Sequence, residues 1–368
     1  MLMHASPPIW SRPTASSIRR LTASIWRQAS RSLRAPETPR LDGKIALVTG
    51  GNGGIGFETS RGLVRRGAEV LIACRNLRKA EEACEGLARE PAATTRPRHV
   101  PLDLADLGSL RGAVDAVEEV TGGRSIDVLI QNAGLWPGRN ATSPQGYEIA
   151  FATNVLGHFA LARELEVRGL LQTTRVVVVT GDIYIRAREC SADFRYRGRL
   201  GGQDAYARSK LGNVWFAREL ARRRPLLTVV VVHPGVVASN LVAGFGGLKR
   251  RLLLDCEQGA QTSLFAATQP GLASGCYLHN TLGIVPWIAD DPGSDDEKAR
   301  ALWTLCESLS KDFDSSTPLI RSRGGGGVGR EVVSAPAAPA ARLGNEVEQK
   351  VVWEVGEAEG GAQGPVKS

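Results

Sequence analysis

Six short runs of β-branched and other apolar residues recur along the middle of the chain, and a segment long enough for a helix separates most neighbouring runs. The runs are Ile45–Val48, Val70–Ala73, His99–Leu102, Val128–Ile130, Val176–Val179 and Val229–Val232. Most of them are apolar throughout, which is typical of parallel strands buried on both faces. Strands that alternate with helices form repeated β-α-β units. The pattern therefore predicts an α/β fold built on one doubly wound parallel sheet flanked by helices.

This pattern is confined to residues 41–310, which we expect to form a single domain. Residues 1–40 hold seven arginines, no lysine and one acid, and apolar residues at steps of three or four between 18 and 33 predict a basic amphipathic helix. Such a segment is typical of a mitochondrial transit peptide; the alternative is an unstructured extension on a cytoplasmic protein. Residues 311–368 are rich in glycine, alanine and proline, which predicts a disordered tail.

Charge, hydropathy and cysteine spacing exclude several classes of protein. Most of the net charge of +8 lies in residues 1–40, so the rest of the chain has too little clustered positive charge for a nucleic-acid face. No apolar run reaches the roughly 18 residues that span a bilayer. The six cysteines form no Cys-x-x-Cys pair and no zinc-like cluster with histidine, so we expect reduced thiols and no metal site.

A glycine-rich loop follows the first predicted strand and precedes a helical stretch. Glycines at such a turn let a phosphate approach the backbone at the start of the helix. The order strand, loop, helix is the one that dinucleotide binding requires, which makes the sheet Rossmann-type. The cofactor-binding residues that we assign to this loop are Gly50, Asn52, Gly54, Ile55 and Gly56.

The end of the second strand indicates which dinucleotide is bound. An acidic residue about 20 positions after the glycines would bind the ribose 2′-hydroxyl of NAD, and none is present there. Arg75 stands at that end instead, and a guanidinium can bind a 2′-phosphate through two charge-assisted hydrogen bonds. The sequence therefore favours NADP(H) over NAD.

At this point the sequence resembles the short-chain dehydrogenase/reductase family over almost all of residues 41–310. Besides the glycine loop, the matching motifs appear in the family's order and spacing, and they contain Asp103, Asn132-Ala133-Gly134, Asn154, Tyr206, Lys210 and Pro234-Gly235. The sequence around Arg75 and Asn154 is most similar to the branch that holds retinol dehydrogenases, WW-domain oxidoreductases and protochlorophyllide reductases. No WW domain precedes the fold in this chain.

The resemblance implies catalytic roles for three of these residues. Tyr206 would be the general acid that protonates a carbonyl oxygen while the nicotinamide delivers hydride. Lys210 lies four residues later on the same helical face, so its positive charge would lower the pKa of the phenol, which is near 10 when unperturbed. In the family this lysine also holds the nicotinamide ribose. Asn154 would help to hold a water that passes protons to Lys210.

The resemblance also implies contacts with the dinucleotide. Asp103 would contact the adenine, and Asn132, Ala133 and Gly134 would run beside the adenine ribose. Pro234, Gly235 and Val237 would contact the nicotinamide end. Gln131 stands where an asparagine is more usual, which is a mild departure from the family pattern.

One departure concerns catalysis directly. The family normally ends its fifth strand with a serine that hydrogen-bonds the substrate oxygen and the tyrosine, and counting from Arg175 puts Gly181 at that position. Glycine has no side chain to donate. Thr180 and Asp182 flank the position, but neighbouring side chains on a strand point to opposite faces. Loss of one such donor typically lowers kcat by about 10²–10³.

Three functions are compatible with this departure. The first is an NADP(H)-dependent reductase or dehydrogenase that borrows a donor from Thr180, Asp182, Tyr184 or the substrate. The second is an NADP(H)-binding sensor or scaffold that has lost catalysis, and the third is a purely structural interaction protein. Because Tyr206, Lys210 and Asn154 are all present, we favour the first.

The sequence says less about the substrate. Apolar residues within 241–254, where the family builds its substrate lid, suggest a small lipophilic substrate or peripheral contact with a membrane. Five arginines between 186 and 199 would suit an anionic ligand or lipid surface, or form an ordinary solvated loop. Fold alone does not determine the substrate. The sequence leaves the oligomeric state and the direction of the reaction open.

Overall fold

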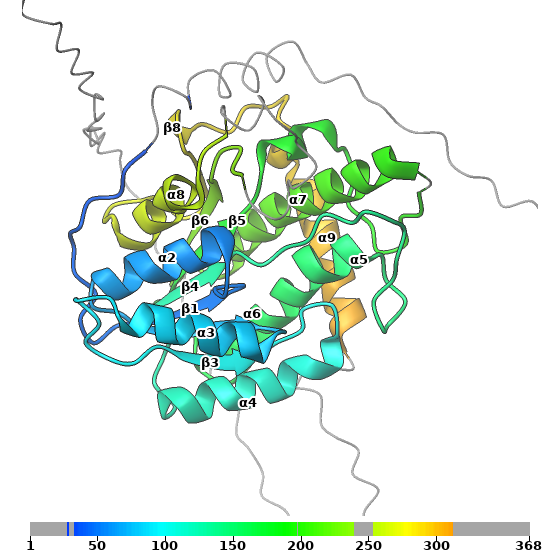
Figure 1. The fold of residues 1–368 in the computed structure, drawn as a ribbon. Helices are drawn as coiled ribbons and strands as arrows, with labels where there is room; N and C mark the ends of the chain where they lie inside the picture. Colours follow the sequence, from blue (N-terminus) through cyan, green and yellow to red (C-terminus); the bar gives the residue numbers. More distant parts are fainter. Residues whose placement is uncertain (1–27, 29–32, 197, 239–252, 312–368) are drawn as a thin grey trace, which may run out of the picture.

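The computed structural model describes residues 28, 33–196, 198–238 and 253–311. One sheet of eight strands lies between two layers of helices, in the order β3-β2-β1-β4-β5-β6-β7-β8 (Figure 1). The strands are β1 (Ile45–Thr49), β2 (Glu69–Cys74), β3 (Arg98–Pro101), β4 (Val128–Gln131), β5 (Arg175–Val179), β6 (Thr228–His233), β7 (Cys276–His279) and β8 (Gly283–Val285). The first seven are parallel, and β8 is antiparallel to β7.

All six expected strands are present at the expected places, and the doubly wound α/β prediction is confirmed. The sequence did not predict β7 and β8. Both strands are short; β7 has no β-branched residue and β8 has only two, so the pattern that identified most of the others was missing.

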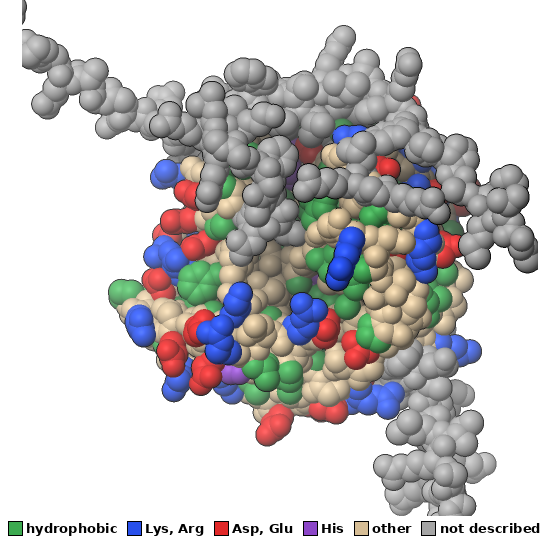
Figure 2. All heavy atoms as spheres, turned by 45° about the vertical axis from the view of Figure 1, so that its right-hand side comes forward, with side chains coloured by type: hydrophobic (Ala, Val, Ile, Leu, Met, Phe, Trp, Pro, Cys, Tyr) green, Lys and Arg blue, Asp and Glu red, His purple; other side chains and the backbone are tan. Residues whose placement is uncertain are grey.

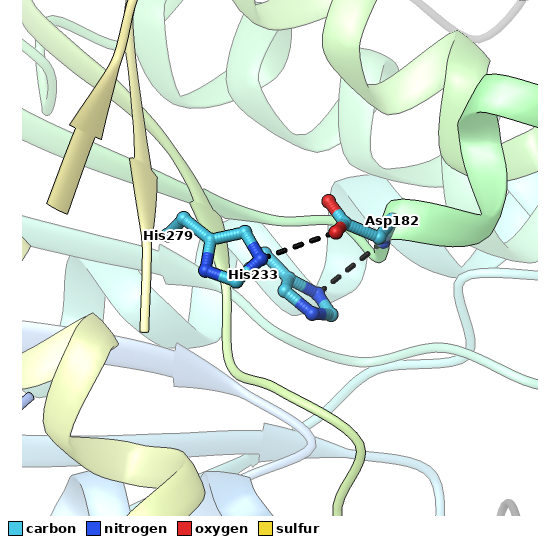
Figure 3. Close-up of side chains that lie close together, drawn as sticks. All are labelled: Asp182, His233 and His279. Carbon is cyan, nitrogen blue, oxygen red and sulfur yellow. Dashed lines mark hydrogen bonds and ion pairs between the residues drawn. The ribbon is translucent and has the colours of Figure 1, made fainter. Parts of the chain in front are cut away.

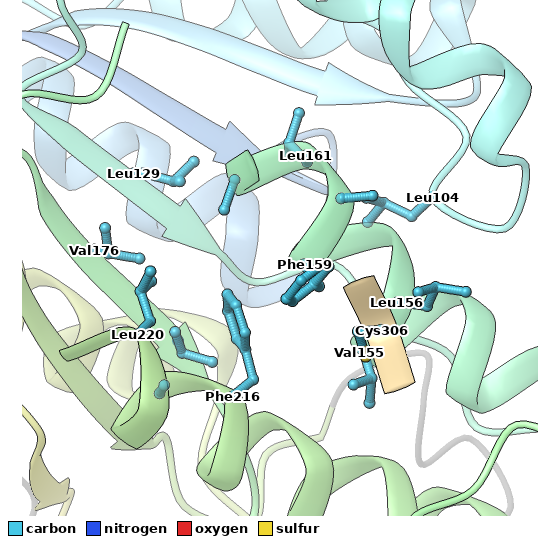
Figure 4. Close-up of a cluster of buried hydrophobic side chains, with 14 of the residues drawn as sticks. Leu104, Leu129, Val155, Leu156, Phe159, Leu161, Val176, Phe216, Leu220 and Cys306 are labelled. Carbon is cyan, nitrogen blue, oxygen red and sulfur yellow. The ribbon is translucent and has the colours of Figure 1, made fainter. Parts of the chain in front are cut away.

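The helices divide between the two faces of the sheet. The longer ones are α2 (Gly54–Arg65), α3 (Leu77–Ala88), α4 (Leu110–Thr121), α6 (Gly157–Val167), α7 (Gly198–Arg223), α8 (Cys256–Thr268) and α9 (Asp296–Ser310), with a short α5 (Ile149–Phe151). Side chains of α2, α3 and α8 pack on one face, and those of α4, α6, α7 and α9 pack on the other. The second layer includes Phe159 and Phe216, whose rings meet edge to face (Figure 4).

The order of the strands determines where a ligand can bind. The chain moves outward from β1 to β2 and β3, then crosses back to β4 on the other side of β1. In a doubly wound sheet, ligands bind at the carboxyl ends of the strands next to this reversal. The glycine loop follows β1, and the segment that carries Asn132 follows β4, so both lie at this edge.

The chain before residue 41 also contacts this domain. The Gln28 side chain is buried and forms two hydrogen bonds with the backbone of Val236: Oε1 accepts from the Val236 N–H at 3.1 Å, and Nε2 donates to the Val236 carbonyl at 3.5 Å. The N–H of Leu33 donates to the Asn280 carbonyl at 2.7 Å. The guanidinium of Arg66 donates to the carbonyls of Ala35 and Pro36. These contacts extend the packed unit at least as far as Gln28. The rest of the expected leader helix and residues 312–368 lie outside the described residues.

The surface carries both signs of charge. On the face drawn in Figure 2, basic and acidic side chains are interspersed rather than gathered into a basic stripe. The sequence has two short basic runs outside residues 1–40, at 222–224 and 249–251. In the first, Arg222 and Arg223 both pair with Glu219 at the end of α7, and Arg224 pairs with Glu166. The run 249–251 lies outside the described residues. In the part of the chain that the structure describes, no helix is long and apolar enough to cross a bilayer.

Candidate active site

The glycine loop forms an open cradle at the start of α2. Gly50 has φ +67°, in the left-handed region that favours glycine. A Cβ on Gly56 would lie 2.3 Å from the Gly50 carbonyl oxygen, so only glycine allows this close approach. At Gly53 and Gly54, by contrast, a Cβ would meet no atom within 4 Å. The start of the helix is therefore open on its outer side, and its free N–H groups fit a dinucleotide phosphate.

Two predicted cofactor residues meet at the ends of β2 and β3. Arg75 Nη1 lies 3.7 Å from Asp103 Oδ2. The Arg75 side chain is 78% exposed, so its guanidinium is accessible to a ligand in solvent. Because an exposed ion pair contributes little to stability, a phosphate could compete for this arginine at small cost.

Asn132 joins the segment after β4 to the end of β1. Its Nδ2 donates to the Thr49 carbonyl at 3.0 Å, and its backbone N–H donates to Thr49 Oγ1, also at 3.0 Å. The N–H of Ala133 donates to the same oxygen. These bonds hold the predicted ribose-binding segment beside the glycine loop.

Buried hydrogen bonds connect Thr49 to Asn154 through a histidine. His158 Nδ1 donates to the Asn154 carbonyl at 3.1 Å, which leaves Nε2 to accept from Thr49 Oγ1 at 2.9 Å. Burial lowers the pKa of His158 to about 4, so the ring is neutral at physiological pH. The imidazole thus links the end of β1, where the glycine loop begins, to Asn154. The sequence alone indicated no role for His158.

Asn154 lies in a π-helical turn, Ala152–Leu156, between α5 and α6. Its Oδ1 accepts from the Leu135 N–H at 2.8 Å, and its Nδ2 donates to the Leu135 carbonyl at 3.0 Å and to Ser209 Oγ at 2.8 Å. The amide therefore fixes the segment after β4 against α7. Single π-turns inside helices are frequent at functional sites.

Tyr206 and Lys210 lie one turn apart on α7, as the sequence predicts. Lys210 Nζ donates to the Val179 carbonyl at 3.0 Å and lies 5.5 Å from the centre of the Tyr206 ring. Burial lowers the pKa of Lys210 to about 8 and raises the pKa of Tyr206 above its usual value near 10. The expected lowering of the tyrosine pKa by the lysine is not seen here, because burial alone sets the direction of the Tyr206 shift.

Trp136 stacks on Tyr206, a contact that the sequence analysis missed. The two ring centres are 4.5 Å apart, and the planes differ by 17°. Two neighbours of Trp136 are held in place: Leu135 by Asn154, and Pro137 by α7, since a Cβ on Gly202 would lie 2.1 Å from the Pro137 carbonyl oxygen. The only available signal was that this tryptophan follows the Asn-Ala-Gly motif by two residues.

Gly181 follows β5 in extended conformation, with φ −159°. A Cβ there would meet nothing nearer than Ile183 Cγ2 at 4.0 Å, so the position has room for a serine. Thr180 does not offer its proton to this space, because its hydroxyl donates to the Lys210 carbonyl at 2.8 Å. The Tyr184 hydroxyl donates to Asp291 Oδ2 at 2.9 Å.

Asp182 is also committed elsewhere. Its Oδ1 accepts from the Tyr277 hydroxyl at 2.5 Å, and its Oδ2 lies 3.1 Å from His279 Nε2 (Figure 3). Both partners lie on β7, the strand that the sequence did not predict. The three side chains suggested as substitutes for the serine thus already have hydrogen-bond partners within the domain.

Asp182, His233 and His279 form a buried group whose ligand atoms lie within 4.8 Å of one another, a spacing that could hold a metal ion. The hydrogen bonds favour a different arrangement. His279 Nδ1 accepts from the Thr281 N–H at 3.1 Å, so Nε2 carries the proton that Asp182 accepts. His233 Nδ1 accepts from the Asp182 N–H at 3.3 Å. A metal ion bound at His279 Nε2 would require the ring proton on Nδ1, where it would point at the Thr281 N–H. The hydrogen bonds therefore fit two neutral imidazoles better than two metal ligands.

The segment expected at the nicotinamide end follows β6. Gly235 has φ +89°, and a Cβ there would lie 2.4 Å from the Asn280 side chain. The Val237 side chain packs against Gly259 on α8, where Ile55 of the glycine loop also packs. The predicted cofactor residues Ile55 and Val237 thus lie together against Gly259 of α8. Most of the expected lid, residues 241–252, lies outside the described residues.

The architecture and these side chains together define a Rossmann-fold oxidoreductase with a tyrosine-lysine pair at the carboxyl edge of the sheet. Comparison with known proteins gives the family. Residues 44–182 match the family model described as short chain dehydrogenase. Human retinol dehydrogenase 14 is 32% identical over 335 residues, which cover 80% of this chain and 97% of that protein. The WW domain-containing oxidoreductase of Drosophila melanogaster is 33% identical over 73% of this chain and 69% of that protein.

Solved structures agree with this similarity. A protein of Mycobacterium paratuberculosis is 32% identical, with a TM-score of 0.60 over 76% of this chain and 98% of that one. A short chain dehydrogenase of Burkholderia cenocepacia in complex with NADP is 25% identical, with a TM-score of 0.54 over 67% of this chain and 99% of that one. The chain belongs to the short-chain dehydrogenase/reductase family, close to its retinol dehydrogenase and WW-domain oxidoreductase members.

Proposed function

We propose that this protein is an NADP(H)-dependent oxidoreductase that interconverts an alcohol and a carbonyl on a small, lipophilic substrate. The observation that carries the proposal is the Tyr206–Lys210 pair on α7, held beside Asn154 at the edge where the glycine loop opens. The names of the retinol dehydrogenase relatives support a lipophilic alcohol as the substrate class.

Each catalytic side chain has a specific task in this proposal. NADP(H), when bound, supplies or accepts the hydride. Tyr206 keeps its proton at neutral pH because burial raises its pKa, so it is ready to protonate a carbonyl oxygen. Lys210 is held by the Val179 carbonyl and stabilises the tyrosinate that remains after proton transfer. Asn154 fixes the segment that carries Gly134. A Cβ added at Gly134 would lie 3.3 Å from Asn154 Oδ1 and 3.6 Å from Lys210 Nζ, so this segment passes close to both side chains.

The preference for NADP(H) rests on Arg75. The guanidinium is exposed beside Asp103 at the end of β2, where a ribose 2′-phosphate would arrive. The NADP found in the Burkholderia relative supports the same cofactor.

A second candidate function is an NADP(H)-binding sensor or scaffold with little or no catalysis. Gly181 favours it, because the serine is missing and the hydroxyls of Thr180 and Tyr184 are engaged elsewhere. The presence of the tyrosine, the lysine and the asparagine favours the enzyme.

NADPH consumption over a panel of lipophilic aldehydes, ketones and quinones separates the two functions. The panel includes all-trans-retinal and 4-nitrobenzaldehyde, and the parent protein is compared with Tyr206→Phe. Loss of a general acid typically lowers the rate by about 10²–10⁴, so turnover in the parent should almost vanish in the variant. An absence of turnover in a parent protein that still binds NADPH tightly would instead support the sensor.

A further inference from the structure

The missing serine leaves the substrate oxygen without its second hydrogen-bond donor. In the proposed reduction, negative charge develops on that oxygen before the proton arrives, and an oriented donor stabilises it. Gly181 cannot supply the donor, and Thr180, Asp182 and Tyr184 already have partners. The donor must then come from another part of the site or from the substrate.

Trp136 is a side chain in direct contact with Tyr206. It comes from the segment after β4, and its ring lies parallel to that of Tyr206 at 4.5 Å. Leu135 directly precedes Trp136, and Asn154 hydrogen-bonds both the N–H and the carbonyl of Leu135. The backbone at Trp136 is therefore held in a defined position. An indole carries one N–H donor and no acceptor.

The indole N–H of Trp136 is available to a ligand. Two other tryptophans donate theirs to backbone carbonyls, Trp215 to Pro292 and Trp287 to Gly275. Trp136 is only partly buried, and among the described residues none accepts its proton. A polar N–H that is half withdrawn from water gains more from a hydrogen bond than an exposed one does.

We propose that Trp136 takes the place of the missing serine and donates its indole N–H to the substrate oxygen. This proposal rests on the proposed oxidoreductase function. In the reduction, the carbonyl carbon accepts a hydride, the π electrons of the C=O bond move to the oxygen, and that oxygen takes the proton of Tyr206. Trp136 keeps its own proton throughout and stabilises the charge on the oxygen through the hydrogen bond.

The test combines Trp136→Phe with Gly181→Ser. Phenylalanine retains an aromatic ring against Tyr206 but removes the donor, so kcat with all-trans-retinal or 4-nitrobenzaldehyde should fall by about 10²–10³. Gly181→Ser restores a donor at the family's position, and Gly181 has room for it. In the Trp136→Phe background it should therefore recover most of the lost kcat, and its gain there should exceed its gain in the parent.

Two controls separate the hydrogen bond from packing. Gly181→Ala in the Trp136→Phe background adds a Cβ without a hydroxyl and should recover nothing. The melting temperature and the calorimetric affinity for NADP⁺ should stay at the parent values in Trp136→Phe, which shows that fold and cofactor site are intact.

The outcomes distinguish this proposal from the one on which it rests. If Tyr206→Phe abolishes turnover while Trp136→Phe keeps the parent kcat, the tryptophan is not the donor and the oxidoreductase stands. Equal recovery by Gly181→Ser and Gly181→Ala would also overturn the donor role. If the parent oxidises no NADPH with either aldehyde, both proposals fail for these substrates.

Discussion

The nucleotide half of the site and its substrate-oxygen half are built differently. After β1, β2 and β4, the glycine loop, Arg75 and Asn132 lie at the carboxyl edge of the sheet, where we propose that the dinucleotide binds. At the end of β5 the family's serine is a glycine, and the next residue, Asp182, is tied to β7. The comparison teaches that one fold can keep its cofactor machinery while the residues that face the substrate oxygen are rearranged.

Replacing Gly181 with serine tests this difference most strongly. The position is extended and open, so the hydroxyl can be added without strain. We expect kcat for carbonyl reduction to rise by up to roughly 10²–10³ when Gly181→Ser is made in the Trp136→Phe background, and by less in the parent, where Trp136 donates to the substrate oxygen in our proposal. Steady-state NADPH oxidation measures the change, with Gly181→Ala as the matched control. An unchanged or lower rate in both backgrounds would mean that a group other than Trp136 already donates to the substrate oxygen.

Arg75→Ala tests the nucleotide half. Removing the guanidinium should lower the preference for NADPH over NADH by about 10- to 100-fold, because a charge-assisted hydrogen bond contributes roughly 1.5–3 kcal/mol. The ratio of kcat/KM for the two cofactors measures the preference. Arg78→Ala is a suitable control, since Arg78 is an exposed arginine on α3 that pairs with Glu82. A preference that survived Arg75→Ala would contradict the assignment of the 2′-phosphate.

The dependence of kcat/KM on pH tests Lys210, which is bonded to the end of β5 and lies beside Tyr206. Burial lowers the pKa of Lys210 to about 8, so the amine loses its charge as the pH rises through that value. The value of kcat/KM for NADPH reports the free protein, and it should therefore fall above about pH 8, by up to about tenfold per pH unit. Lys210→Arg stays charged and should lack this fall, although its rate is lower overall. The same fall in Lys210→Arg would assign it to another group.

The sequence predicted the strand, glycine turn and helix of the nucleotide half well because their requirements are local. A β-branched run, a glycine-rich turn and a helix follow one another between residues 45 and 65, and each leaves its own pattern. The Tyr206–Lys210 spacing is local in the same way. Gly181 could be placed by counting along β5 alone.

The rest depends on contacts between distant residues. That Asp182 is unavailable follows from Tyr277 and His279, which lie about 95 residues further on and in a strand without a clear pattern. The stacking of Trp136 on Tyr206 and the position of His158 between Thr49 and Asn154 likewise require the fold. No periodicity or motif in one sequence encodes such pairs.

The hydrogen bonds of Gln28 and Leu33 have a consequence for proteolytic maturation. A protease that trimmed the chain at residue 40 would remove the buried amide that pairs with Val236, next to the turn at Gly235, and would leave the Arg66 guanidinium without two of its carbonyl acceptors. Proteolytic processing that leaves these hydrogen bonds intact must cut the chain before Gln28.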